Sequence, residues 1–235
     1  MIHYRPLGPI AAISFDLDDT LYDNAPVIRQ AEQQLQDWLA QRVKLREDSY
    51  GYFQGWRQRV LQENPELAHD TTASRHRALV RGLGALGVSQ AEGLADAAMA
   101  HFLEWRSRCD INPQVHQLLA ELASRRPLVA ISNGNADIDR LGLGSYFKAA
   151  FHAGGSRQMK PSPDLFIAAA QQLKLTPQAI LHVGDHLRED IEGALGAGFQ
   201  TAWYNPDGLA LKDQAKGKLL PHFEFQTLDS LRQLL

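Results

Sequence analysis

The chain has 235 residues, of which 44% are hydrophobic and 22% charged, and its formal net charge is −3. This length can bury one substantial core, or a core together with a smaller second domain. The slight negative charge offers no basic field for a polyanion, so nucleic-acid binding is not expected. No apolar run reaches the length of a membrane span. Cys109 is the only cysteine, which excludes an intrachain disulfide; with no apolar leader, this favours the cytoplasm.

Residues 10–15 form a short apolar segment that is typical of a buried strand. Asp16 and Asp18 follow at once, at the strand end where open α/β sheets place their ligands. Two carboxylates so close together repel each other unless a cation lies near both, and an all-oxygen set of ligands favours Mg²⁺. An acidic turn without a function is the simpler alternative.

Helical periodicity then occupies most of the next hundred residues. We expect helices over about 26–43, 48–62 and 70–79, and a fourth from residue 89 onward. Pro26 suits a first helical turn, and Glu92 follows Ser89 with the spacing of a capping box. The stretch is too long to be a loop, so it predicts a helical insertion.

From residue 112 the pattern alternates between helix and strand. Helices are expected over 113–124, 136–143, 162–173, 189–197 and 228–235, and strands over 128–131, 149–152, 179–183 and 201–204. This alternation predicts an α/β fold with a parallel, doubly wound, Rossmann-like sheet. We expect a core made of residues 1–22 and 109–235, with an all-helical cap of residues 23–108 inserted between the two parts.

Three of the predicted strands end in polar side chains. They are Asp16 and Asp18 after the first, Ser132 and Asn133 after the second, and Asp185 and Asp190 after the third. Parallel strands end at one edge of a sheet, so these side chains should converge. Lys160 stands between the second and third groups and can supply one positive charge. A cation site, a lysine, a hydroxyl and free backbone N–H groups suit a phosphate dianion.

With these motifs, the sequence resembles the haloacid dehalogenase-like superfamily of aspartyl phosphatases. The motifs occur in order, as D-x-D-x-T at 16–20, Ser132, Lys160 and G-D-x-x-x-x-D at 184–190. The resemblance implies a Mg²⁺-dependent phosphomonoester hydrolase in which Asp16 is the nucleophile, forming an aspartyl-phosphate, and Asp18 is the general acid and base. It further implies a set of ligands for the metal and for the phosphate. Mg²⁺ would be held by Asp16, the backbone carbonyl of Asp18, Asp185 and Asp190, and the phosphate by Ser132, Asn133 and Lys160, with Thr20 orienting the loop.

Shorter segments resemble a narrower group within this superfamily, the enterobacterial phosphatases of riboflavin synthesis. The segments are residues 4–8, 105–108, 131–136 and 220–222. This resemblance implies 5-amino-6-(5-phosphoribitylamino)uracil as a substrate, and FMN as another. His186 departs from the pattern, because a second acidic residue is expected there, and either loosens the metal site or faces solvent.

The inserted helices should select the substrate by closing over the strand ends. The candidate side chains are Tyr22, Asn24, Trp56, His69, Asp70, Arg75 and Arg77. Trp56 can offer an aromatic face to a flavin or uracil ring, but its helical spacing favours a core position. For Arg75 and Arg77, too, the simpler explanation as solvated helix charges is favoured.

Several alternatives stay open at this point. They are a promiscuous sugar-phosphate or nucleotide phosphatase, a phosphomutase, a haloacid dehalogenase, and a non-catalytic protein that binds a phosphorylated metabolite. Asp18 favours phosphate chemistry, because a dehalogenase needs no acid to release halide. We expect a monomer or a small homo-oligomer whose partner is a small phosphorylated metabolite. The G-x-G-x-x-G pattern at 82–87 follows a helix rather than a strand, so it does not predict a nucleotide site.

Overall fold

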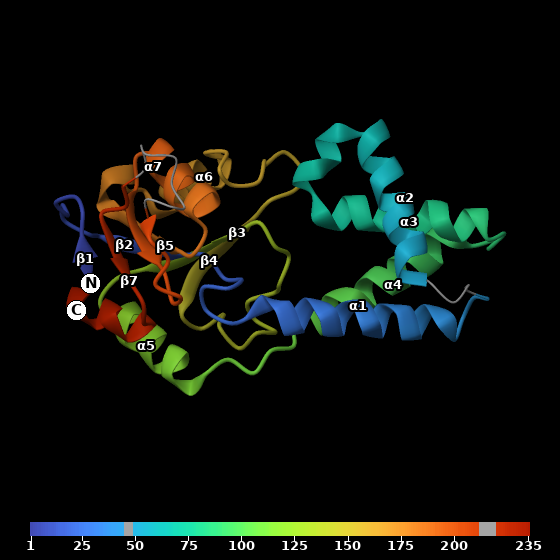
Figure 1. Ribbon diagram of the computed structural model, residues 1–235, viewed down its shortest axis with the longest axis horizontal. Coiled ribbons are helices and arrows are strands. Elements are labelled where there is room, and N and C mark those ends of the chain that lie inside the picture. The colour runs from blue at the N-terminus through green and yellow to red at the C-terminus, as the bar shows by residue number, and fades with distance from the viewer. Residues whose placement is uncertain (45–48, 212–219) are drawn as a thin grey trace.

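The computed structural model describes residues 1–44, 49–211 and 220–235, which form a twisted sheet at one end of the molecule and a group of helices at the other (Figure 1). The described sheet has seven strands in the order β1-β7-β6-β5-β2-β3-β4. Their bounds are β1 Ile2–His3, β2 Ala12–Phe15, β3 Leu128–Ser132, β4 Phe147–His152, β5 Ile180–Gly184, β6 Gln200–Tyr204 and β7 Phe223–Phe225. Among the described strands, only β1 runs antiparallel to its neighbour. The predicted α/β class with a mostly parallel sheet is confirmed.

Helices cover both faces of this sheet (Figure 1). On one face, α5 (Pro113–Ala123) and η4 (Leu228–Leu234) pack against Ile13 and Phe15 of the central strand. On the other face, α6 (Asp164–Leu173) and α7 (Gly193–Gly196) pack against Ala12. All four residues of β2 are buried, which explains why the strand has an unbroken apolar sequence instead of an alternating one.

Four of the helices between β2 and β3 in the chain form the far end of the molecule (Figure 1). They are α1 Asn24–Ala40, α2 Ser49–Glu63, α3 Thr71–Ala85 and α4 Ala91–Arg106, with the short η1 Pro65–His69 between α2 and α3. We refer to residues 24–106 as the helical segment. It has its own apolar cluster, which includes Leu39, Leu83 and Phe102. The four predicted helices are confirmed, although residue 48, the expected start of the second, lies outside the described residues.

The prediction of a helix over residues 136–143 is wrong, because this stretch forms turns. The Asp137 side chain accepts the backbone N–H groups of Asp139 and Arg140, and Gly142 has a φ of 73° that ends the turn. The predicted helix over 189–197 begins instead as a π-helical turn, η3 Leu187–Glu192, before α7. None of the helices in the described part of the chain is long and apolar enough to cross a membrane.

Candidate active site

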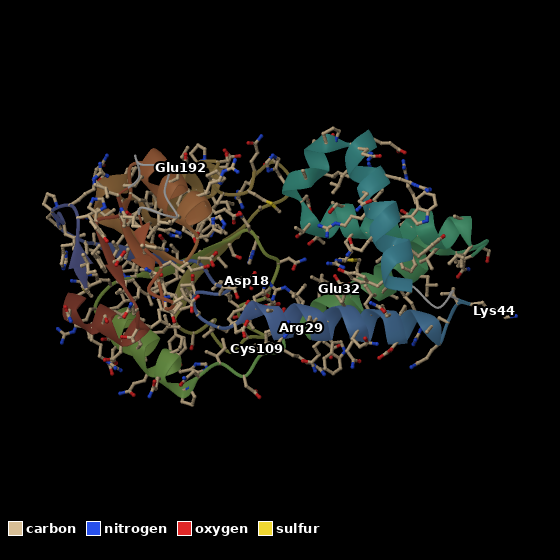
Figure 2. The ribbon with its side chains drawn as sticks, in the orientation of Figure 1. Asp18, Arg29, Glu32, Lys44, Cys109 and Glu192 are labelled. Carbon is tan, nitrogen blue, oxygen red and sulfur yellow. The ribbon has the colours of Figure 1, made fainter. Side chains whose placement is uncertain are left out.

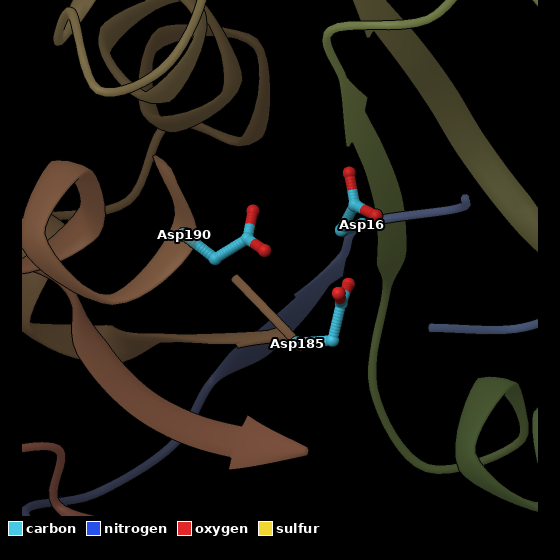
Figure 3. Close-up of side chains that lie close together, drawn as sticks. All are labelled: Asp16, Asp185 and Asp190. Carbon is cyan, nitrogen blue, oxygen red and sulfur yellow. The ribbon is translucent and has the colours of Figure 1, made fainter. Parts of the chain in front are cut away.

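Three carboxylates meet at the carboxyl end of the central strands (Figure 3). Asp16 follows β2 and Asp185 follows β5, and these strands are parallel neighbours in which Phe15 pairs with Val183. Asp190 reaches the same place from η3. One oxygen of each group lies within 4.8 Å of the others. An all-oxygen group at this spacing is able to hold a hard divalent cation.

The Lys160 side chain lies between two of these carboxylates. Its Nζ donates to Asp16 Oδ1 at 2.5 Å, to Asp190 Oδ1 at 2.6 Å and to the carbonyl oxygen of Ile131 at 2.8 Å. Burial alone would lower the pKa of Lys160, but the two carboxylates outweigh it and raise that pKa, so the lysine stays charged. Burial raises the pKa of Asp16 well above its usual value, and Lys160 opposes this shift. The sequence prediction that the three motifs converge is therefore confirmed in space.

Asp190 is fixed by a buried network that sequence analysis missed. His182 Nε2 donates to Asp190 Oδ1 at 3.2 Å, and His182 Nδ1 accepts from Ser14 Oγ at 2.9 Å. Burial lowers the pKa of His182, so the ring is neutral and holds one proton for this donation. A Cβ at Gly184 would overlap the Asp190 side chain, so glycine is required there. The polar His182 inside an otherwise apolar strand was the available signal for this network.

Ser132 is the last residue of β3 and Asn133 follows it, and both carry polar groups beside Lys160. Ser132 is buried, and its Oγ accepts from the backbone N–H of Gly134 at 2.9 Å. The Asn133 side chain accepts from Lys160 N at 2.7 Å and donates to Lys160 O at 3.0 Å. It also donates to Glu189 Oε2 at 2.8 Å. The Asn133 side chain therefore fixes the backbone that carries Lys160.

Thr20 Oγ1 donates to Asp185 Oδ1 at 2.8 Å, so the loop after β2 is tied to the end of β5. Burial, and then the charge of Asp190, raise the pKa of Asp185 to about 6. The backbone carbonyl of Asp185 accepts from Trp203 Nε1 at 2.8 Å. A cleft of about 810 Å³ opens beside these groups and is lined by Thr20, Asp185 and Tyr204, among others.

Asp18 lies between the sheet and the helical segment (Figure 2). Its Oδ1 accepts from the Tyr22 hydroxyl at 2.6 Å, and Arg106 Nη2 donates to both of its oxygens at 2.6 Å. Burial and the nearby Asp18 carboxylate raise the pKa of Tyr22, which keeps the hydroxyl protonated as a donor. Arg106 is a second residue that sequence analysis did not select, and it is almost fully buried.

Five of the other expected substrate residues fall into two groups by their contacts. The ring and polar contacts of Trp56, Arg75 and Arg77 with described residues all lie within the helical segment. Trp56 packs on Tyr52 and Gly82, Arg75 pairs with Glu32 and covers Phe102, and Arg77 donates to Asn64. Asp70 and His69 instead accept backbone N–H groups of Gly155 and Met159, in the loop that leads to Lys160.

Asn24 and His186 act through local hydrogen bonds. The Asn24 backbone N–H donates to Asp19 Oδ1 at 2.9 Å. The His186 ring is exposed and its Nδ1 accepts the Glu189 N–H at 3.1 Å, while its backbone N–H donates to Asp190 Oδ2 at 2.9 Å. Of the two roles considered for His186, the solvent-facing one matches this position, and the side chain also caps the turn that carries Asp190.

Comparisons with known proteins point in one direction. The family model of the haloacid dehalogenase-like hydrolases matches residues 10–198 of this chain. Over the full length of both chains, the sequence is 42% identical to 5-amino-6-(5-phospho-D-ribitylamino)uracil phosphatase YigB of Escherichia coli K12. It is 26% identical to human N-acylneuraminate-9-phosphatase, over 97% of this chain and 95% of the human one.

Among solved structures, a 2-haloacid dehalogenase from Pseudomonas syringae pv. Tomato DC3000 superposes with a TM-score of 0.89 and 40% identity, over 96% of this chain and 97% of that one. The putative hydrolase YfnB of Bacillus subtilis superposes with a TM-score of 0.64 over 97% and 99% of the two chains. At 23% identity, the second similarity concerns the fold alone.

Proposed function

The chain belongs to the haloacid dehalogenase-like hydrolases and is a phosphatase, and from this premise we propose that it hydrolyses the phosphomonoester of 5-amino-6-(5-phosphoribitylamino)uracil, and that of FMN, with the help of Mg²⁺. The identity to the E. coli phosphatase supports this choice of substrate. The ligand is then a small phosphorylated metabolite. A cytoplasmic site of action is part of the proposal, in keeping with a single cysteine.

The residues present fit the proposed cation. Three carboxylates offer oxygens within 4.8 Å of one another, and such oxygens are the ligands that Mg²⁺ prefers. Asp16, Asp185 and Asp190 would hold the ion, together with the backbone carbonyl of Asp18. When bound, Mg²⁺ supplies positive charge that neutralises the phosphoryl oxygens.

The proposed reaction has two displacements. Asp16 attacks phosphorus, so that an Asp16 Oδ–P bond forms while the ester P–O bond breaks, and Asp18 gives a proton to the departing alkoxide. Asp18 then takes a proton from the water that attacks the aspartyl-phosphate, which releases inorganic phosphate and restores Asp16. Ser132, the Asn133 N–H and Lys160 bind the phosphoryl oxygens during both steps.

The location of Asp18 is the observation that carries the proposal. A Cβ built on Gly134 would collide with Asp18 Oδ2 and lies 3.2 Å from Ser132 Oγ, so the second carboxylate lies beside the expected phosphate site. A haloacid dehalogenase has no use for an acid at this point, because halide leaves without a proton. This argument favours a phosphatase over the activity named for the P. syringae structure.

We also propose that residues 23–108 act as a cap on a core of residues 1–22 and 109–235. Asp70 and His69 support this idea, since they connect the helical segment to the loop that carries Lys160. Closure of such a cap would exclude water and select the substrate. Tyr22, Asn24, Trp56, Arg75 and Arg77 remain the candidate selecting residues.

The test is release of inorganic phosphate from the ribitylaminouracil phosphate, FMN and several sugar phosphates, with Mg²⁺ and with a chelator. Wild type is compared with Asp16→Asn and with the exposed control Asp96→Asn. We expect phosphate release to require both Mg²⁺ and Asp16, and the Asp96→Asn variant to release phosphate as fast as wild type. Equal release from all substrates would contradict the riboflavin assignment. Release of chloride from 2-chloropropionate would contradict hydrolysis as the main activity. So would conversion of a sugar phosphate to its isomer without loss of the phosphate.

A further inference from the structure

The Asp18 carboxylate is held by two residues that lie at the two ends of the helical segment, where it joins the sheet. Tyr22 lies just before α1, and Arg106 is the last residue of α4. Both donate to Asp18, at 2.6 Å in each case, and Arg106 Nη1 also approaches the Tyr22 hydroxyl at 3.5 Å. Residues 84 positions apart in the chain therefore meet at one carboxylate.

Arg106 is buried to an unusual degree for an arginine. It is 2% exposed, and the Asp18 side chain is 18% exposed. A buried guanidinium is costly unless a charged partner compensates for its lost hydration. Asp18 is that partner, and a single nitrogen, Nη2, lies within 2.6 Å of both of its oxygens. This geometry fixes the direction of the carboxylate more firmly than a contact to one oxygen would.

Two further contacts complete this arrangement. Gly134 leaves the space into which Asp18 Oδ2 fits, because a Cβ there would collide with that oxygen and lie 3.1 Å from Arg106 Nη2. The hydroxyl of Ser107, next to Arg106, accepts the Asp137 backbone N–H at 2.9 Å. The end of α4 is thus anchored to the loop after β3, which begins directly after Ser132.

We propose that Arg106 is a positioning residue that holds the Asp18 carboxylate beside the phosphate site and couples its position to the helical segment. The inference rests on the proposed role of Asp18 in proton transfer. In that step the Asp18 carboxyl group, which holds the proton taken from water in the preceding turnover, passes this proton to the ester oxygen as the P–O bond breaks. Arg106 takes no part in the bonds that form or break, and acts only by keeping Asp18 within reach of the ester oxygen.

The experiment compares two esters that differ in their need for an acid. An alkyl phosphate such as FMN has a poor leaving group, whereas 4-nitrophenyl phosphate releases a stable phenolate without a proton. The value of kcat/KM reports on formation of the aspartyl-phosphate in both cases. Arg106→Met and Arg106→Lys are measured beside Asp18→Asn, with Arg108→Met as the matched control, because Arg108 is exposed and pairs with Glu104.

We expect Arg106→Met to lower kcat/KM for FMN about 100-fold, the usual scale of general acid catalysis, and for 4-nitrophenyl phosphate less than about fivefold. Arg106→Lys should recover part of the loss, and Arg108→Met should resemble wild type. Adding Arg106→Met to Asp18→Asn should cost nothing more with FMN, since both changes remove the same function.

Equal losses for the two esters, or a further loss in the double variant, would overturn the positioning role while leaving the phosphatase intact. A wild type that hydrolyses neither ester contradicts the proposed function itself, and the inference with it. If Arg106→Met does not fold, Arg106→Lys and Tyr22→Phe replace it, because each retains most of the side-chain volume. The same split between esters is then expected at a smaller size, and its absence counts against the inference.

Discussion

The Lys160 Nζ atom lies 2.5 Å from Asp16 Oδ1, and both side chains are buried. The lysine also pairs with Asp190, so one ammonium group is shared by two carboxylates inside the protein. Removal of a single partner from such a group leaves buried charge without compensation. The contact therefore matters for the stability of the protein, and Lys160 also has a proposed role in binding the phosphoryl group.

Lys160→Met should lower the free energy of unfolding by about 3–5 kcal/mol in metal-free buffer and abolish phosphate release. Urea denaturation measures the first effect and a phosphate assay the second. Lys148→Met is the control, since Lys148 is exposed on β4. An unchanged unfolding curve for Lys160→Met would contradict the ion-pair argument.

Mg²⁺ should raise the melting temperature. At a concentration 100-fold above its Kd, it should add about 2.7 kcal/mol to the free energy of unfolding. The gain should depend on pH because of Asp185, whose pKa is raised to about 6 from its ordinary value near 4. Without metal, this group weakens the fold as pH rises from about 4 to 6, since the folded protein holds the proton more tightly.

With metal, the proton competes with Mg²⁺, so the apparent affinity should be about tenfold lower at pH 5 than at pH 7. Melting curves across a Mg²⁺ titration at the two pH values measure this difference. Asp185→Asn should bind the ion weakly at both. A stabilisation of equal size at pH 5 and pH 7 would show that Asp185 is not a ligand.

Gly134→Ala should lower phosphatase activity about 10- to 100-fold with little change in the fold. The added Cβ would displace the Asp18 carboxylate and would also lie 3.1 Å from the Arg106 Nη2 atom that holds it. Gly93→Ala is the control, because nothing lies within 4 Å of the Cβ that it would add. Full activity of Gly134→Ala would mean that Asp18 has room to move without loss.

Asp70→Ala should destabilise the protein by about 1–2 kcal/mol, because Asp70 accepts both the Ala73 N–H at the start of α3 and the Gly155 N–H. Asp70→Asn keeps an oxygen that can accept the first of these, so its cost should be smaller. Thermal unfolding of the two variants gives the comparison. Equal melting temperatures for Asp70→Ala and wild type would show that the Asp70 hydrogen bond at the start of α3 does not stabilise the protein.

The strand ends could be predicted from sequence because the same residues specify both the fold and the site. Residues 10–15 are apolar up to the first carboxylate, and parallel strands bring Asp16, Ser132 and Asp185 to one edge. Strands β1 and β7 were missed because segments of two and three residues leave no measurable periodicity.

The burial of Arg106 and its pairing with Asp18 could not be predicted from the sequence, for a different reason. At the last turn of a helix an arginine is ordinarily a solvated cation that favours the helix dipole, and its partner lies 88 positions away. Its spacing from Met99 and Phe102 places it on the apolar face of α4, which was the only hint of burial. Spacing alone cannot tell which distant carboxylate such a residue will meet.

The order of strands in the sheet also has a consequence for the folding of this chain during translation. Strand β2 is made early, after β1 but before the other described strands, and its partners β3 and β5 follow much later, so that Ile13 pairs with Leu128 and Ala12 with Ile180. While the ribosome is still adding residues up to about 184, the helical segment can form its own apolar cluster, but β2 has no complete pairing. The nascent chain thus exposes an apolar strand until late in translation, the situation in which chaperones act.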